Sequence, residues 1–154
     1  QACKIGPVEL ISAVVYEDAT TLAIVAATAE TLGLDVATCL QEFGRYWVRF
    51  AERGSYGAMM DFTGQDLRTF IANLDRMHAA ISLSMPHART PSFSLGGNTE
   101  SEIRVSYWSD RAGLEPFVVG LLEGLLDRFG ESGSVTHVPG TSNGAEFLIT
   151  LSGQ

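Results

Sequence analysis

The chain has 154 residues and is 45% hydrophobic, which fits one domain with a single core and excludes a disordered chain. Its formal net charge of −8 argues against a nucleic-acid partner, because binding a phosphate backbone needs a dense positive face. No apolar run reaches the roughly 18 residues of a membrane span. The two cysteines, Cys3 and Cys39, form no CxxC pattern, which favours a reduced, cytoplasmic protein.

Apolar residues at helical spacing predict three helices in the first half of the chain. The first runs from Asp18 to Leu32 and ends at Gly33, and the second runs from an Asp35 cap to about Arg53. Thr63-Gly64-Gln65-Asp66 fits a capping box with Asp66 in its last position. The helix that it opens is expected to continue to about Met85, because Pro86 cannot extend it.

The second half of the chain changes to a strand period. Alternation from Ile103 to Asp110 predicts a strand, which a turn at Gly96-Gly97-Asn98 joins to a shorter strand around Ser92–Leu95. A helix follows over Leu114–Phe129, and two last strands are expected at about Ser134–Val138 and Ala145–Leu151. The fold class is therefore α+β, with N-terminal helices followed by a four-stranded antiparallel sheet and one inserted helix.

His78 falls on the apolar face of the third predicted helix, four residues after Leu74. Burying an imidazole there costs free energy unless something bonds to it. The ring is either a core histidine hydrogen-bonded to a backbone carbonyl or an axial ligand of a heme iron, which requires a neutral imidazole on a rigid element. The position of one histidine does not decide between these interpretations.

A second group of polar side chains lies at the end of the strand that begins at Ile103. Tyr107, Ser109 and Arg111 have two-residue spacing, which favours one sheet face, although Arg111 is close to the strand end. A phenol, a hydroxyl and a guanidinium together offer several donors to a carboxylate. Alternatively, Arg111 pairs with a protein carboxylate while the other two residues line the sheet.

Several short segments, in order along the chain, resemble one known family. Tyr107-Trp108-Ser109-Asp110-Arg111 matches the Tyr-x-Ser-x-Arg motif of the heme-nitric oxide/oxygen binding (H-NOX) family, which includes the heme domain of soluble guanylate cyclase and bacterial relatives. Asn73 to His78 is similar to its proximal-histidine segment, and Pro86 to Phe93 is similar to its Pro-x-x-x-x-Pro-Ser-Phe stretch. Glu42-Phe43-Gly44-Arg45 is also similar to a segment of this family, and the resemblance extends from about residue 10 onward.

The resemblance implies a heme b site with roles for particular residues. His78 would ligate the iron, Tyr107, Ser109 and Arg111 would bind the heme propionates, and Pro91 would press on the heme from the histidine side. His87, where relatives usually carry glycine, is expected to be a solvated loop residue, and His137 an ordinary strand residue. Residues 1–154 are interpreted as a single heme-binding sensor domain that lacks the helices with which the family's chains begin.

The family's distal residues are expected to be Phe117 and Trp47. Oxygen-binding relatives place a tyrosine three residues before a glycine, and counting back from Gly120 puts Phe117 in that position. A phenyl ring donates no hydrogen bond, so the resemblance implies a site for nitric oxide and carbon monoxide. Trp47, whose indole N–H is a donor, is the other distal candidate.

The resulting expectation is a heme-based gas sensor, not an enzyme. Gas binding would weaken the bond to His78 and let its helix move, and a partner such as a histidine kinase, a cyclic-di-nucleotide enzyme or a cyclase would read that change. No GxSxG, HExxH or P-loop motif supports catalysis. The alternative is a heme-free interaction domain that uses the pocket of Tyr107, Ser109 and Arg111 for an anionic ligand.

Overall fold

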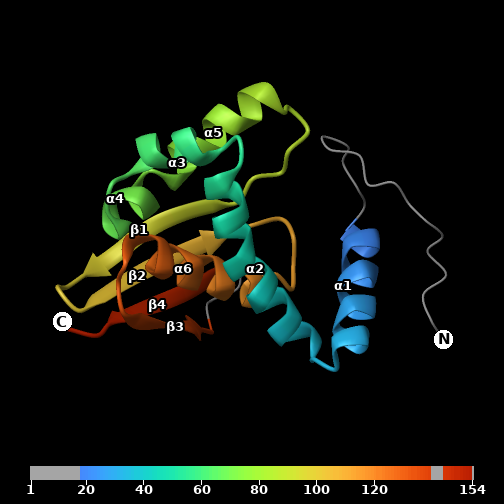
Figure 1. The fold of residues 1–154 in the computed structure, drawn as a ribbon. Helices are drawn as coiled ribbons and strands as arrows, with labels where there is room; N and C mark the ends of the chain where they lie inside the picture. Colours follow the sequence, from blue (N-terminus) through green and yellow to red (C-terminus); the bar gives the residue numbers. More distant parts are fainter. Residues whose placement is uncertain (1–17, 140–143, 154) are drawn as a thin grey trace.

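The computed structural model describes residues 18–139 and 144–153, and its elements confirm the predicted α+β class. Figure 1 shows the helices gathered on one side of an antiparallel sheet. Along the chain the elements are α1 (Asp18–Leu32), α2 (Val36–Arg53), α3 (Gly57–Thr63), α4 (Leu67–Ala72), α5 (Leu74–Ser84), β1 (Ser92–Asn98), β2 (Glu102–Trp108), α6 (Glu115–Phe129), β3 (Gly133–Val138) and β4 (Ala145–Leu151).

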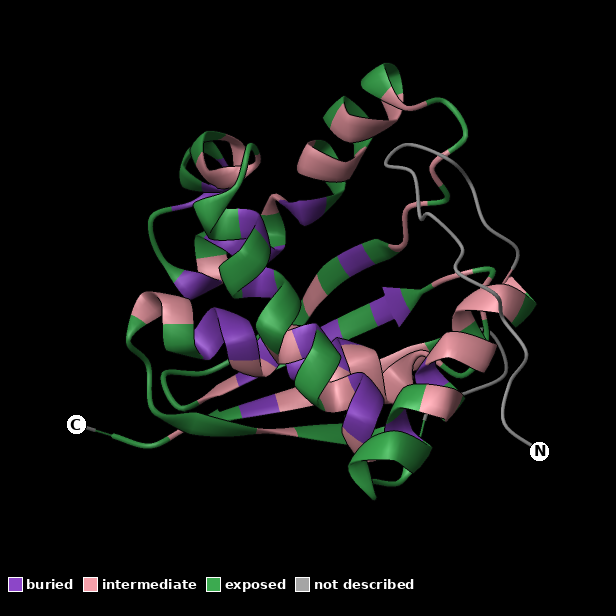
Figure 2. Cartoon of the chain, turned by 45° about the vertical axis from the view of Figure 1, so that its right-hand side comes forward, coloured by how far each residue is buried: buried purple, intermediate pink, exposed green. Residues whose placement is uncertain are grey.

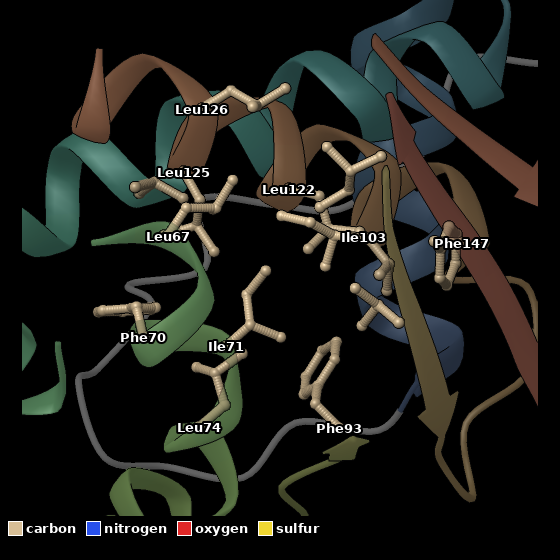
Figure 3. Close-up of a cluster of buried hydrophobic side chains, with 14 of the residues drawn as sticks. Leu67, Phe70, Ile71, Leu74, Phe93, Ile103, Leu122, Leu125, Leu126 and Phe147 are labelled. Carbon is tan, nitrogen blue, oxygen red and sulfur yellow. The ribbon is translucent and has the colours of Figure 1, made fainter. Parts of the chain in front are cut away.

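The sheet has the order β1-β2-β4-β3, and every neighbouring pair is antiparallel. Alternate residues of β2 are buried, so one face of the sheet meets the helices while the other carries exposed side chains such as Trp108. Figure 2 shows the buried residues concentrated between α6 and the sheet. The core cluster in Figure 3 joins Phe93, Ile103 and Phe147 of the sheet to Leu122 of α6 and Ile71 of α4.

Two of the predicted helix boundaries were wrong. The single helix expected from Thr63 to Met85 is broken at Asn73, whose φ of −100° and ψ of 1° leave the helical region and whose amide donates to the Thr63 carbonyl at 2.9 Å. The cap is Asp66 itself, which accepts the Thr69 N–H at 2.9 Å, and Thr63 instead ends α3. The short helix α3, between Gly54 and Gly64, was not predicted.

The strands also differ from the prediction at one turn. Gly96-Gly97-Asn98 continues β1 through an irregularity in register, and the chain reverses at Thr99, whose hydroxyl accepts the Glu102 N–H at 3.0 Å. β2 ends at Trp108, so the expected strand positions Ser109 and Asp110 lie beyond it. The connection between β3 and β4 lies partly outside the described residues.

Helices α2 and α6 cross with their backbones in close approach. A Cβ on Gly120 would collide with the carbonyl oxygen of Gln41, and a Cβ on Gly44 would collide with that of Phe117. Polar pairs connect the same two helices: Gln41 Nε2 lies 2.9 Å from a Glu123 oxygen, and the Arg45 guanidinium binds Asp127 in a bidentate pair at 2.8 and 3.0 Å. Glycines thus set the distance between the two helices.

Among the described residues, no single helix is both long and apolar enough to cross a membrane. Only α1 and α2 taken together have the length and apolar composition of a membrane span, and the two helices meet at a bend of 103°.

We predict that Gly120→Ala lowers the free energy of unfolding by about 1–3 kcal/mol or more, because the new methyl group must push α2 away from α6. Urea denaturation measures the change. The control is Gly97→Ala, where nothing lies within 4 Å of an added Cβ and the same added methyl should change stability by less than about 1 kcal/mol. Equal losses in both variants would show that the close crossing carries no special cost.

Candidate functional site

A cavity of about 310 Å³ lies between α2, α3, α5, α6 and the start of β1. Its lining is almost entirely apolar, and all four methionines of the chain contribute to it: Met59, Met60, Met77 and Met85. The volume is within the usual range for small-molecule and cofactor pockets. Four of the sequence-predicted site residues also line this cavity: Trp47, His78, Pro91 and Phe117.

His78 is held in one orientation by a backbone carbonyl. Its Nδ1 lies 3.0 Å from the oxygen of Pro91, and because a carbonyl only accepts, Nδ1 carries the proton of this hydrogen bond. Burial lowers the pKa of the imidazole, so the ring is neutral at pH 7. The proton on Nδ1 leaves the lone pair on Nε2, the arrangement that metal-ligating histidines commonly have.

Asp75 fixes the helix of His78 to the first strand. One carboxylate oxygen accepts the Phe93 N–H at 2.7 Å and the other accepts the Ser92 hydroxyl at 2.8 Å. Asp75 and His78 therefore bind successive residues of the segment from Pro91 to Phe93. Asp75 was not among the sequence-predicted site residues, although its position three residues before His78, on the same side of a helix, was a usable signal.

The three residues of the Tyr-x-Ser-x-Arg motif do not line the cavity. Tyr107 is 7% exposed and lies against Phe93, with ring centroids 5.3 Å apart, and burial raises its pKa. Ser109 lies past the end of β2 and accepts the Arg111 N–H at 3.1 Å. Only Tyr107 is in the strand, so the three side chains do not share one strand face as their spacing suggested.

Arg111 lies beside a protein carboxylate. Its Nε is 2.8 Å from an oxygen of Asp18, an ion pair in which Nε makes no hydrogen bond. The same Asp18 binds Nη2 of Arg89 with both oxygens at 3.1 Å, and Nη1 of Arg89 lies 3.4 Å from Asp110. Asp18 and Arg89 are separated by 71 residues, so no local pattern predicted this cluster.

Aromatic rings form the wall of the cavity contributed by α2 and α6. Trp47 and Phe117 line the cavity, and the ring of Phe43 contacts both of them. Its centroid lies 5.4 Å from that of Phe117 and 6.2 Å from that of Trp47. Trp47 is 40% exposed, so this wall opens to the surface. The donors in the lining besides His78 are the Trp47 indole and the Tyr56 and Thr90 hydroxyls.

The other histidines lie elsewhere. His87 is exposed in the loop before β1, and His137 stacks on Phe147 with centroids 5.2 Å apart; neither lines the cavity. Across the described ranges, no three His, Cys, Asp or Glu side chains are grouped to hold a metal ion. One imidazole is sufficient, however, where a macrocycle holds the iron and the protein supplies an axial ligand.

Comparison with known proteins places this geometry in a family. Residues 3–137 match the Haem-NO-binding family, and the chain belongs to it. It is 33% identical over 90 residues to guanylate cyclase soluble subunit beta-2 of Rattus norvegicus, which covers 58% of this chain but 13% of that protein. It is 35% identical over 79 residues to soluble guanylate cyclase gcy-33 of Caenorhabditis elegans, covering 51% of this chain and 8% of that protein. The chain thus spans a small part of these relatives.

Solved structures confirm the fold. An H-NOX protein from S. oneidensis in the Fe(II)NO ligation state superposes with a TM-score of 0.80 at 19% identity, covering 93% of this chain and 80% of that one. The unliganded Fe(II) H-NOX protein from K. algicida gives a TM-score of 0.77 at 18% identity, covering 92% and 76%. The expected family and fold are both confirmed.

The lowered pKa of His78 predicts a pH dependence of stability in the heme-free protein. An unfolded histidine titrates near 6.5 and the folded one below it, so the unfolded state binds more protons in between. The contribution of His78 to the free energy of unfolding should therefore be complete above pH 6.5. It should decrease as the pH drops toward the folded pKa, by at most about 1.4 kcal/mol per pH unit.

Urea denaturation between pH 7.5 and 5.5 measures this slope, and His78→Gln should reduce it. His87→Gln, at an exposed position, is the control and should keep the wild-type slope. An unchanged slope in His78→Gln would mean that burial does not oppose protonation of this ring.

Proposed function

We propose that this chain is a heme-based sensor domain for nitric oxide and carbon monoxide, with heme b bound in the cavity and His78 as its axial ligand. One observation carries the proposal: the Pro91 carbonyl holds the proton on Nδ1, so Nε2 keeps its lone pair in an otherwise apolar cavity. These residues fit the group, since an apolar cavity suits a macrocycle and a neutral, oriented imidazole suits its iron.

His78 would hold the iron of a bound heme, and a ferrous heme would supply the affinity for a diatomic gas. The residues of this chain connect the heme site to the protein backbone. His78 and Asp75 both bind the segment from Pro91 to Phe93, so a changed pull on His78 strains the junction of α5 and β1. Pro91 also lines the cavity, and we assign it the role of pressing on the ring.

We assign the propionates of the heme to Tyr107, Ser109 and Arg111. Arg111 supplies the charge, and Tyr107 reaches the cavity side of the sheet next to Phe93. Among the described residues that line the cavity, no nucleophile has an adjacent base, and the domain is proposed to signal and not to catalyse. Its output would pass to a histidine kinase, a cyclic-di-nucleotide enzyme or a cyclase, and the similarity to guanylate cyclases supports the last of these.

His78→Ala should abolish stable binding of ferrous heme, because the cavity lining then retains no imidazole. The absorption spectrum of the purified protein measures this through its Soret band, and free imidazole should restore part of the band. His87→Ala is the matched control and should leave the spectrum unchanged. A normal Soret band in His78→Ala would refute the ligand assignment.

The same spectrum tests the alternative function. If the wild-type protein gives no Soret band after reconstitution with heme, the chain is a heme-free interaction domain whose Arg111 region binds an anion. The ion pair between Arg111 and Asp18 is the observation that favours this alternative, since it demonstrates that a carboxylate fits there.

We expect the ferrous protein to bind nitric oxide and carbon monoxide but to retain no oxygen in air. Heme proteins with a neutral histidine ligand hold oxygen well only where a distal side chain donates a hydrogen bond. Phe117 and its neighbour Phe43 donate none. Phe117→Tyr should confer measurable oxygen binding by adding a hydroxyl to this wall.

Anaerobic and aerobic absorption spectra provide the measurement. A stable oxygenated spectrum from the wild-type protein would contradict the prediction. Its disappearance in Trp47→Phe or Tyr56→Phe would then identify the donor, since both side chains line the cavity.

A further inference from the structure

The first residue of α1 is bound to two guanidinium groups at once. Asp18 contacts Nη2 of Arg89 with both oxygens at 3.1 Å and Nε of Arg111 at 2.8 Å. Arg89 also lies 3.4 Å from Asp110. The cluster contains two cations and two carboxylates, so its formal charge is zero.

The two arginines of the cluster are next in the chain to segments that border the cavity, although neither side chain lines it. Arg89 directly precedes Thr90 and Pro91, which line the cavity, and Arg111 follows the strand that carries Tyr107. Two guanidinium groups held together next to such segments suit the carboxylates of an amphipathic ligand. Asp18 already occupies that site with the same functional group.

Helix α1 has few other attachments within the described residues. Its buried residues, Val25 and Ala29, pack with Cys39 and Leu40 of α2, and Phe117 of α6 adjoins this small cluster. Figure 1 shows α1 at the side of the molecule, away from the sheet. The ion pairs of Asp18 are thus the contacts that connect the start of α1 to Arg89 and Arg111.

We propose that Asp18 competes with the carboxylates of the bound cofactor for Arg89 and Arg111, so that loading the site releases the start of α1. This inference rests on the proposed heme site and adds Arg89 to it as a second carboxylate-binding residue. Two propionates brought to a neutral cluster leave two excess negative charges. Displacing Asp18 into solvent relieves that repulsion, because the Asp18 side chain is already 38% exposed.

The consequence is that α1 responds to occupancy of the cavity. Phe117 lines the cavity and also packs against the cluster between α1 and α2, so a second contact connects α1 to the site. A helix whose attachment changes on loading presents a different surface to a partner.

Hydrogen exchange of the α1 backbone amides tests the proposal. Heme is compared with heme dimethyl ester, which has the same ring and iron but no free carboxylates. Heme should accelerate exchange over residues 22–32 on the order of fivefold, the factor expected when ion pairs of this exposure are lost. The ester should bind through His78 and leave the exchange rates of these residues unchanged.

Two variants separate the contact of Asp18 from its charge. In Asp18→Asn, exchange over residues 22–32 should be fast without heme and show no further rise when heme is added. Asp110→Asn removes the same charge from the cluster but contacts only Arg89, so it should keep the wild-type response to heme.

Each outcome decides the proposal. If heme binds with a normal Soret band while exchange in α1 stays constant, the competition is refuted and the heme site stands. Equal acceleration by heme and its ester would also refute it, because the carboxylates would then be irrelevant. If no Soret band forms, the proposed function and this inference fail together.

Discussion

The close crossing of α2 and α6 is the constraint on which the rest of the molecule depends. Gly44 and Gly120 remove the side chains that would separate the two backbones, and the pair of Arg45 with Asp127 holds the register of the helices. This contact fixes one wall of the cavity, including Trp47 and Phe117. The opposite wall belongs to a different helix, α5, which carries His78.

That second wall is organised by hydrogen bonds and not by tight packing. His78 and Asp75 each use a polar atom to bind the chain between Pro91 and Phe93. Helix α5 contributes a single fully buried residue, Leu74, with Met77 partly buried against the core, so these bonds add much of what holds its position. An element held in this way shifts at a small cost in free energy, which agrees with the proposed sensor role.

Sequence periodicity predicted the elements that bury a continuous apolar stripe, such as α6, and the alternation in β2. It failed where local polar bonds decide the backbone: the break at Asn73 depends on a side-chain bond to Thr63, ten residues away. The residues of the candidate site also differ in whether a local sequence pattern predicts them. The position of His78 at the cavity could be predicted because its helix face is a local pattern, whereas the pairing of Asp18 with Arg89 joins distant segments and has no sequence signal.

The methionine lining has a consequence for how this protein can be studied. All four methionines border the cavity and none lies elsewhere in the chain. Their thioether side chains are unbranched and adaptable, which suits a cavity whose occupant changes shape or charge. Isotope labelling of the methionine methyl groups would therefore yield a nuclear magnetic resonance spectrum in which every signal originates at the cavity wall, free of contributions from the remainder of the fold.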